Sequence, residues 1–124
     1  MVSFKTLIVD SDFISRKLIM EILRKNIYSV DIIESVDSRD AIEIVKSEDD
    51  IDLIILDIEL PKLNGIDFLD IYSGLDVKRS PIIAISSKSI NTDSVMDGRV
   101  NAFVHKPITK DKLLRAIGNL YFNI

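Results

Sequence analysis

Residues 53–65 read LIILDIELPKLNG. The first four residues, Leu53–Leu56, form the short apolar run expected of a strand that is covered on both faces. Asp57 ends this run, and Pro61 and Gly65 follow it. The segment therefore predicts a buried strand that carries a carboxylate at its carboxyl end.

Similar runs occur on both sides of this segment. Each one is short, apolar or β-branched, and interrupted by polar residues, which again favours strands inside a sheet. They are Leu7–Val9, Ile32–Ser35, Ile82–Ile85 and Ala102–Val104. Together with residues 53–56, these runs predict five strands.

The segments between the strands have the spacing of amphipathic helices. In the first segment, Ile14, Leu18 and Ile22 recur every four residues, with Ile19 and Leu23 beside them, and predict a buried face. Arg16 in the same segment is expected to face water. Ser38 is predicted to cap the second helix, because a serine side chain can accept a hydrogen bond from the first turn. Three further helices are predicted over about 66–72, over 92–97 and behind a Thr109 cap.

Regular alternation of strands and helices predicts a parallel sheet with right-handed crossovers and helices on both faces. In such sheets, functional groups gather beyond the carboxyl ends of the strands, where the strand order reverses. Asp10, Asp57 and Ser86 directly follow predicted strands, and Lys106 lies two residues after the last one. We therefore expect these four polar side chains to converge at one edge of the sheet.

The composition limits the classes of function. A length of 124 residues fits one domain, here 1–124, and an apolar content of 47% is enough for a core. The chain has no cysteine and one histidine, so a bound metal would be held by oxygen. The net charge of −4 disfavours nucleic acid and anionic membranes as partners. No apolar run approaches the roughly 20 residues of a membrane span, and we expect a soluble, cytoplasmic protein.

The segments quoted above resemble, in order, the receiver domains of response regulators. Residues 53–65 look like the phosphoacceptor signature of that family, in which an aspartate ends the third strand. Residues 7–10 (LIVD), 81–87 (PIIAISS) and 103–107 (FVHKP) resemble the family's first, fourth and fifth strands. The resemblance covers essentially the whole chain. It implies an α/β fold with a doubly wound, five-stranded parallel sheet, flavodoxin-like strand order 2-1-3-4-5 and five helices.

The resemblance also implies a phosphoacceptor role in a two-component signalling system. Asp57 would take a phosphoryl group from a histidine kinase or a phosphotransfer protein, because a carboxylate can hold it as an acyl phosphate. Lys106 and Ser86 would position and stabilise the oxygens of that group. Mg²⁺ is the implied cofactor, with Asp10, Asp57 and the backbone carbonyl of Glu59 as its contacts.

Output is implied to pass through a change of shape. Ser86 and Phe103 take the places of the family's switch residues, and Phe103 would turn between exposed and buried rotamers. The implied partner is a downstream protein target. The resemblance also allows a homodimer through the face made by the fourth helix, the fifth strand and the last helix. It implies a signalling module rather than an enzyme.

One departure from the family keeps other interpretations open. Ser11 stands where family members carry a second metal-binding acid. Either Mg²⁺ binds more weakly, or Asp12 or the Glu59 side chain compensates. One alternative is a receiver-like docking module that works without phosphorylation. Another is a haloacid-dehalogenase-like phosphatase that uses Asp10 as its nucleophile, although this leaves residues 57–65 unexplained. A flavin-binding module is rejected, because acids after the first strand would repel its phosphate.

Overall fold

The structure is a computed structural model that describes residues 3–59, 65–88 and 98–121. Five strands and four helices lie within these residues. In chain order they are β1 (Phe4–Val9), α1 (Phe13–Asn26), β2 (Val30–Ser35), α2 (Ser38–Ser47), β3 (Leu53–Asp57), α3 (Gly65–Ser73), β4 (Ile82–Ser86), β5 (Ala102–His105) and α5 (Lys110–Tyr121). The helix predicted over 92–97 lies outside the described residues.

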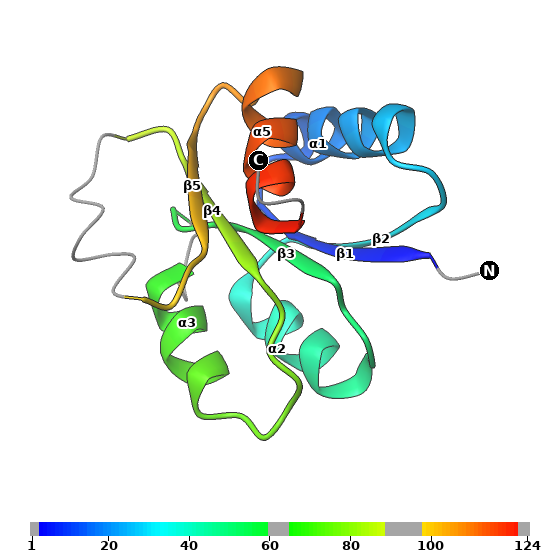
Figure 1. The fold of residues 1–124 in the computed structure, drawn as a ribbon. Helices are drawn as coiled ribbons and strands as arrows, with labels where there is room; N and C mark the ends of the chain where they lie inside the picture. The colour runs from blue at the N-terminus through cyan, green and yellow to red at the C-terminus, as the bar shows by residue number, and fades with distance from the viewer. Residues whose placement is uncertain (1–2, 60–64, 89–97, 122–124) are drawn as a thin grey trace.

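All five strands pair in parallel in one sheet with the order β2-β1-β3-β4-β5. Helices α1 and α5 cover one face of this sheet, and α2 and α3 cover the other (Figure 1). The strand order reverses between β1 and β3, which are neighbours in the sheet although β2 lies between them in the chain. The doubly wound, flavodoxin-like fold is therefore confirmed.

The core consists of two apolar layers, one on each face of the sheet. Strand β3 is buried at every residue and contributes to both layers. Leu53 and Ile55 pack with side chains of α1 and α5. Ile54 and Leu56 pack with side chains of α2 and α3 on the opposite face. A strand that is covered in this way reads as a continuous apolar run, which is why residues 53–56 predicted it correctly.

The predicted buried face of α1 is wrong in part. Ile14 and Leu18 are 71% and 39% exposed, although Ile22 is buried as expected. Ile19 and Leu23, which were predicted beside this stripe, are fully buried and lie at the centre of the face that packs on the sheet. The buried face is therefore shifted away from Ile14 and Leu18, toward the side of the helix that carries Ile19 and Leu23.

Arg16 was expected to face water and is buried. Its guanidinium donates a hydrogen bond to the backbone oxygen of Asp10 at 2.7 Å and pairs with the Glu34 carboxylate at 3.0 Å. Burial of a charged group is tolerated where it is paired and hydrogen-bonded. These two partners lie at the ends of β1 and β2, so they were not visible from the spacing within the helix.

The predicted cap of α2 is also wrong, by one residue. Asp37, not Ser38, is the N-cap: its backbone is extended, and its carboxylate accepts a hydrogen bond from the Asp40 N–H at 2.8 Å. Ser38 is the first helical residue and is buried. The Thr109 cap of α5 is confirmed, because its hydroxyl accepts a hydrogen bond from the Lys112 N–H at 3.2 Å.

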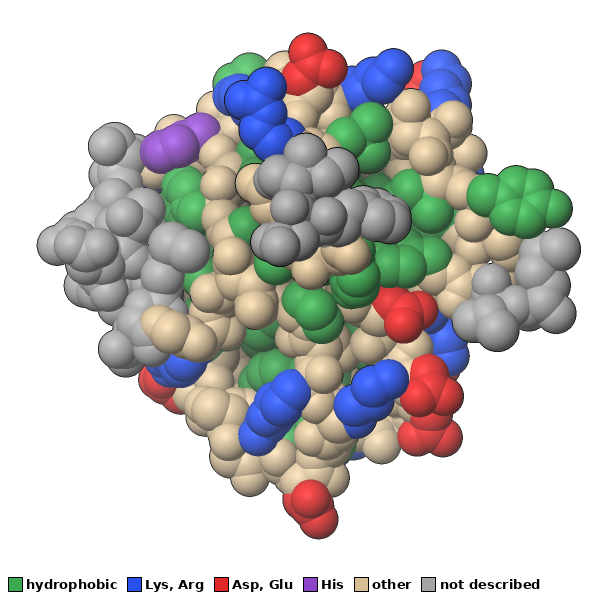
Figure 2. All heavy atoms as spheres, viewed as in Figure 1, with side chains coloured by type: hydrophobic (Ala, Val, Ile, Leu, Met, Phe, Trp, Pro, Cys, Tyr) green, Lys and Arg blue, Asp and Glu red, His purple; other side chains and the backbone are tan. Residues whose placement is uncertain are grey.

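The surface carries charges of both signs. In Figure 2, Lys and Arg side chains lie interspersed with Asp and Glu side chains on the face in view. This mixture agrees with the small net charge of the sequence. Within the described ranges, no helix has both the length and the apolar character needed to cross a membrane.

Candidate functional site

Four polar side chains stand at the carboxyl edge of the sheet. Asp10 directly follows β1, Asp57 and Ser86 are the last residues of β3 and β4, and Lys106 directly follows β5. Parallel strands end at the same edge, so the strand order brings these positions together. Asp10 and Ser86 are fully buried, and Asp57 is 4% exposed.

Lys106 joins the two aspartates. Its Nζ lies 3.0 Å from Asp57 Oδ2 and 3.2 Å from Asp10 Oδ2. The cis peptide bond between Lys106 and Pro107 follows β5 directly. The Lys106 N–H also donates to the Ser86 backbone oxygen at 2.8 Å, which ties the residue to the end of β4. One ammonium group therefore faces two nearly buried carboxylates.

At this site two carboxylates, those of Asp10 and Asp57, share one ammonium group, that of Lys106. Burial is the largest influence on Asp57 and raises its pKa, against the hydrogen bonds from the Glu59 N–H and from Lys106, and the nearby Asp10 charge raises it further. Burial lowers the pKa of Lys106, but the hydrogen bond to Asp57 and the charges of both aspartates outweigh burial and raise it. Lys106 alone therefore does not balance the negative charge of the two aspartates.

The loop after β1 fixes the Asp10 side chain. Asp10 Oδ1 accepts a hydrogen bond from the Asp12 N–H at 2.9 Å. The Asp10 N–H donates to the Ser35 backbone oxygen at 3.0 Å, and its own backbone oxygen accepts from Arg16. Sequence reasoning missed Arg16 as part of this support. The available signal was the carboxylate of Glu34 near the end of the predicted second strand, which is the only charge partner of Arg16 in the described structure.

The site fits a divalent cation. Two carboxylates, Asp10 and Asp57, face one cationic side chain, and the buried Asp10 Oδ2 accepts no hydrogen bond from the described residues. Hard oxygen donors of this kind suit Mg²⁺, which is usually held by one or two carboxylates and several waters. In the described part of the chain, no three acidic or histidine side chains surround a single metal position. Asp10 and Asp57 are therefore the candidate side-chain ligands.

The two acids expected to compensate for Ser11 have other partners. The Asp12 carboxylate caps α1, where it accepts the Ile14 N–H at 3.1 Å. The Glu59 carboxylate lies on the residues after β4, where it accepts hydrogen bonds from Ser86, Ser87 and Lys88. Ser11 itself is exposed.

Gly65 packs against the backbone of the loop that follows Asp57. A Cβ atom at this position would lie 2.9 Å from the Asp57 backbone oxygen and would collide with the Cα of Ile58. Only glycine allows so close an approach of two backbones. The glycine of the 53–65 segment therefore helps to hold the end of β3, where Asp57 is presented.

Phe103 and His105 lie side by side on β5. Their ring centroids are 4.9 Å apart at an interplanar angle of 76°, an edge-to-face contact. Phe103 is half-buried against the layer under α2 and α3, and His105 is exposed. In the sheet register, Phe103 pairs with Ala84 and His105 pairs with Ser86. In the sheet, strand β4 alone thus separates β5 from Asp57 at the end of β3.

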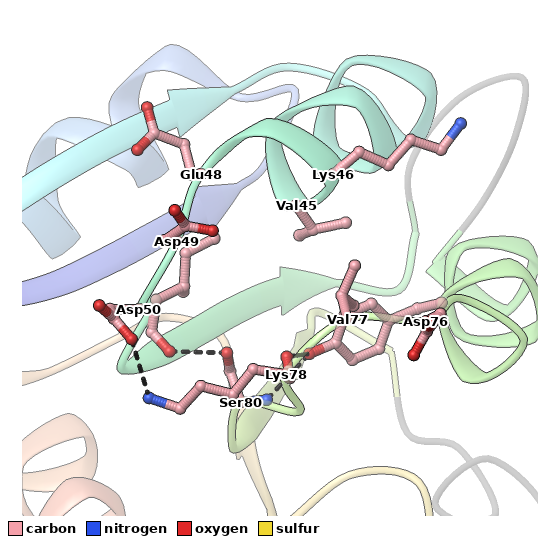
Figure 3. Close-up of a pocket in the computed structure, with 11 residues that line it drawn as sticks. Val45, Lys46, Glu48, Asp49, Asp50, Asp76, Val77, Lys78 and Ser80 are labelled. Atoms are coloured by element: carbon pink, nitrogen blue, oxygen red, sulfur yellow. Dashed lines mark hydrogen bonds and ion pairs between the residues drawn. The ribbon is translucent and has the colours of Figure 1, made fainter.

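A pocket between α2, β3 and the loop after α3 lies at the other end of the sheet (Figure 3). Two of its charged groups already pair with each other, as Lys78 Nζ lies 3.4 Å from Asp50 Oδ1. It stands at the amino ends of β3 and β4, whereas ligands of such sheets bind beyond the carboxyl ends. The group around Asp57 is therefore the better candidate site.

Comparisons with known proteins identify the family of the chain. The chain matches the family described as response regulator receiver domain over residues 6–118. The chemotaxis protein CheY of Bacillus subtilis (strain 168) is 31% identical over 115 residues, which cover 91% of this chain and 93% of that protein. A protein-glutamate methylesterase/protein-glutamine glutaminase of Hahella chejuensis is 28% identical over 109 residues, 84% of this chain but only 29% of that protein. The chain thus spans less than a third of that longer relative.

Solved structures share the fold. The receiver domain of a sensor histidine kinase from Pseudomonas aeruginosa PAO1 superposes with a TM-score of 0.82, covering 99% of this chain and 100% of that one at 21% identity. That structure has a magnesium ion coordinated in its active-site cleft. Since the family match runs from β1 into α5, this chain belongs to the response regulator receiver domains, the signalling modules of two-component systems.

Proposed function

We propose that this chain is one phosphoacceptor receiver domain, and that Asp57 takes a phosphoryl group from a histidine kinase or a phosphotransfer protein. The observation that carries the proposal is the pairing of Asp57 with Lys106 at 3.0 Å, at the edge of the sheet where β1, β3, β4 and β5 end. The family match and the chemotaxis relative support the same conclusion.

The chemistry needs positioning more than covalent assistance. An Asp57 oxygen forms a bond to the phosphorus atom, and the bond between phosphorus and the donor's imidazole nitrogen breaks. The electron pair of that bond stays on the nitrogen. Lys106 would stabilise the negative oxygens of the transferred group, and the Ser86 hydroxyl would donate a hydrogen bond to one of them.

Asp10 and Asp57 would hold Mg²⁺, with the Glu59 backbone carbonyl as a further contact. The ion would supply positive charge that Lys106 alone cannot provide between two carboxylates. Support comes from the buried Asp10 Oδ2, which accepts no hydrogen bond from the described residues and has Lys106 as its only charge partner among them.

Output would run through Ser86 and Phe103 to a downstream protein that binds the β5 and α5 face. The same face would serve a homodimer. The half-buried position of Phe103, next to the exposed His105, supports a role in which its environment can change.

Acetyl phosphate plus Mg²⁺ tests the proposal directly. We expect one phosphoryl group per chain by intact mass spectrometry, mapped to Asp57 by peptide analysis, and no label after Asp57→Asn or after chelation of Mg²⁺. Asp50→Asn is a matched control, because Asp50 is an exposed acid far from the site at a positive φ of 60°, which asparagine also adopts. A label on Asp10 would support a phosphatase instead, and a chain that takes no label would be a docking module.

A further inference from the structure

The Glu59 carboxylate occupies a site built from four donors at the end of β4. It accepts hydrogen bonds from the Ser86 hydroxyl, from the Ser87 N–H and hydroxyl, and from the Lys88 N–H. The Ser87 hydroxyl lies 2.9 Å from Oε2, and the Lys88 N–H lies 3.1 Å from Oε1. This is an unusually complete set of donors for a side chain that is partly exposed.

These donors together form an anion site. Successive backbone N–H groups that point to one position make a concavity that binds negative oxygens, and hydroxyl donors strengthen it. Burial raises the pKa of Glu59, but the hydrogen bonds from Ser86, Ser87 and Lys88 outweigh burial and lower the pKa to about 2. Glu59 is therefore ionised at neutral pH, and a negative charge fills the site.

The site lies next to the phosphoacceptor. Ser86 directly follows Ile85, which pairs with Asp57 in the sheet register. Glu59 is two residues after Asp57, and its N–H donates to Asp57 Oδ1 at 2.8 Å. Glu59 thus holds one Asp57 oxygen through its backbone N–H, and its carboxylate occupies the donors of Ser86, Ser87 and Lys88.

We propose that the Glu59 carboxylate is a built-in competitor of the phosphoryl group: it occupies the Ser86, Ser87 and Lys88 donors and must leave them before a phosphoryl group on Asp57 can use the Ser86 hydroxyl. This inference rests on the proposed function and adds a regulatory element to it. The same contacts hold Ser87 and Lys88 in place while Asp57 is unmodified, so the release of these two residues accompanies phosphorylation.

Two substitutions separate occupation of the site from simple charge repulsion. Glu59→Asp keeps the negative charge but withdraws the carboxylate by one methylene, so the donors are freed. Glu59→Gln removes the charge but keeps an oxygen at the same reach. Competition for the donors predicts that Glu59→Asp is labelled by acetyl phosphate about tenfold faster than the unmodified chain, which corresponds to roughly 1.4 kcal/mol. Repulsion predicts that only Glu59→Gln is faster.

Glu48→Asp is the matched control, because Glu48 is an exposed acid that pairs with Lys5 far from Asp57. Rates are compared at saturating Mg²⁺, so a change in metal affinity does not enter. Labelling of Glu59→Asp at the rate of the unmodified chain overturns the inference and leaves the proposed function intact. If neither the variants nor the unmodified chain are labelled, both the inference and the proposed function are contradicted.

A second measurement needs neither phosphodonor nor metal. Hydrogen exchange of the Ser87 amide, which donates to Glu59, should be slow in the unmodified chain and several-fold faster in Glu59→Asp, while exchange within β1 and β3 stays unchanged. The Lys88 amide is less informative, because it also donates to the Ser86 hydroxyl at 3.1 Å. Equal exchange of the Ser87 amide in both proteins would show that the carboxylate does not hold it, and would contradict the competition.

Discussion

Gly65 packs closely against the backbone of Asp57 and Ile58 and so supports the position of Asp57. Gly65 begins α3, and its Cα packs directly on the backbone that leaves β3. The Gly65 N–H also lies 3.4 Å from the Ile58 backbone oxygen. A side chain at this position has no free space to enter, because the atoms it would meet are backbone atoms and cannot rotate away.

We therefore predict that Gly65→Ala destabilises the fold by about 1–3 kcal/mol, the usual cost of overpacking. It should also slow labelling of Asp57, because the end of β3 must shift to make room. Urea unfolding followed by circular dichroism measures the first effect, and intact mass spectrometry measures the second.

Gly74→Ala provides the comparison. A Cβ at Gly74 would lie 3.6 Å from the Ile71 backbone oxygen, an ordinary contact. Its free energy of unfolding should therefore stay within about 0.5 kcal/mol of the unmodified chain. Equal stability of the two variants would mean that the loop after β3 adapts to a side chain, and that Gly65 is not needed for packing.

Single residues also mark the limit of what the sequence predicts. Asp10, Asp57, Ser86 and Lys106 were placed correctly at the strand ends, because apolar strands and the direction of a parallel sheet fix their location. The contacts of Arg16 and Glu59 were not predicted. Both side chains reach partners that are distant in the chain, and only the packed structure defines which donors and acceptors face them.

Among the elements, α5 is tied to the sheet by its last residue. The Tyr121 hydroxyl donates a hydrogen bond to the Asp52 backbone oxygen, just before β3, and its ring makes an edge contact with Phe4 at 5.3 Å. Burial and the Asp52 charge raise the pKa of Tyr121 to about 12. The neutral phenol is thus favoured in the folded chain.

This contact predicts a stability change at alkaline pH. In the unfolded chain tyrosine loses its proton near pH 10, whereas folded Tyr121 keeps it up to about pH 12. Between these values the folded state binds more protons, so stability falls as pH rises. The stabilising effect of Tyr121 is fully present below pH 10 and is lost as pH approaches 12.

The Tm of Tyr121→Phe should therefore fall less steeply than that of the unmodified chain between pH 10 and 12. Differential scanning fluorimetry across this range measures the difference. Tyr28→Phe is the control, because Tyr28 is 84% exposed and should leave the slope unchanged. Parallel curves for Tyr121→Phe and the unmodified chain would show that α5 is not held by this phenol.

The elements also differ in how well the sequence predicts them. Strands β3 and β4 were located to within one residue, because burial on both faces leaves an apolar run that polar residues interrupt, whereas only the second half of β1 was predicted. The predicted face of α1 was wrong in part, and the predicted cap of α2 was wrong by one residue. Ile14 and Leu18 have helical spacing but lie outside the buried face, and Asp37 competed with Ser38 for the first N–H groups of α2. Tertiary contacts and local side-chain chemistry decided both.

Across the whole molecule, strands β4 and β5 connect the candidate site to Phe103 and His105. Ser86 ends β4 and pairs with His105, and the Ser86 backbone oxygen accepts the Lys106 N–H at 2.8 Å. The His105 ring in turn contacts Phe103. A displacement of Ser86 toward a phosphoryl group would therefore act on β5 through a backbone hydrogen bond and on Phe103 through its neighbour on the strand.

A ligand changes such an equilibrium only through its different affinity for the two states. A charge-assisted hydrogen bond from the Ser86 hydroxyl to a phosphoryl oxygen is worth about 1.5–3 kcal/mol, enough to shift a two-state population by about tenfold or more. We predict that beryllium trifluoride with Mg²⁺, a mimic of the phosphoryl group, shifts backbone NMR signals of residues 102–105 and of α5. Ser86→Ala should still be labelled at Asp57 but show much smaller shifts at these positions. Ser15→Ala, which removes a buried hydroxyl without a hydrogen-bond partner among the described residues, should keep them. Shifts of equal size in Ser86→Ala and in the unmodified chain would exclude the hydroxyl as the relay and assign the coupling to Lys106, which contacts Asp57 and follows β5 directly.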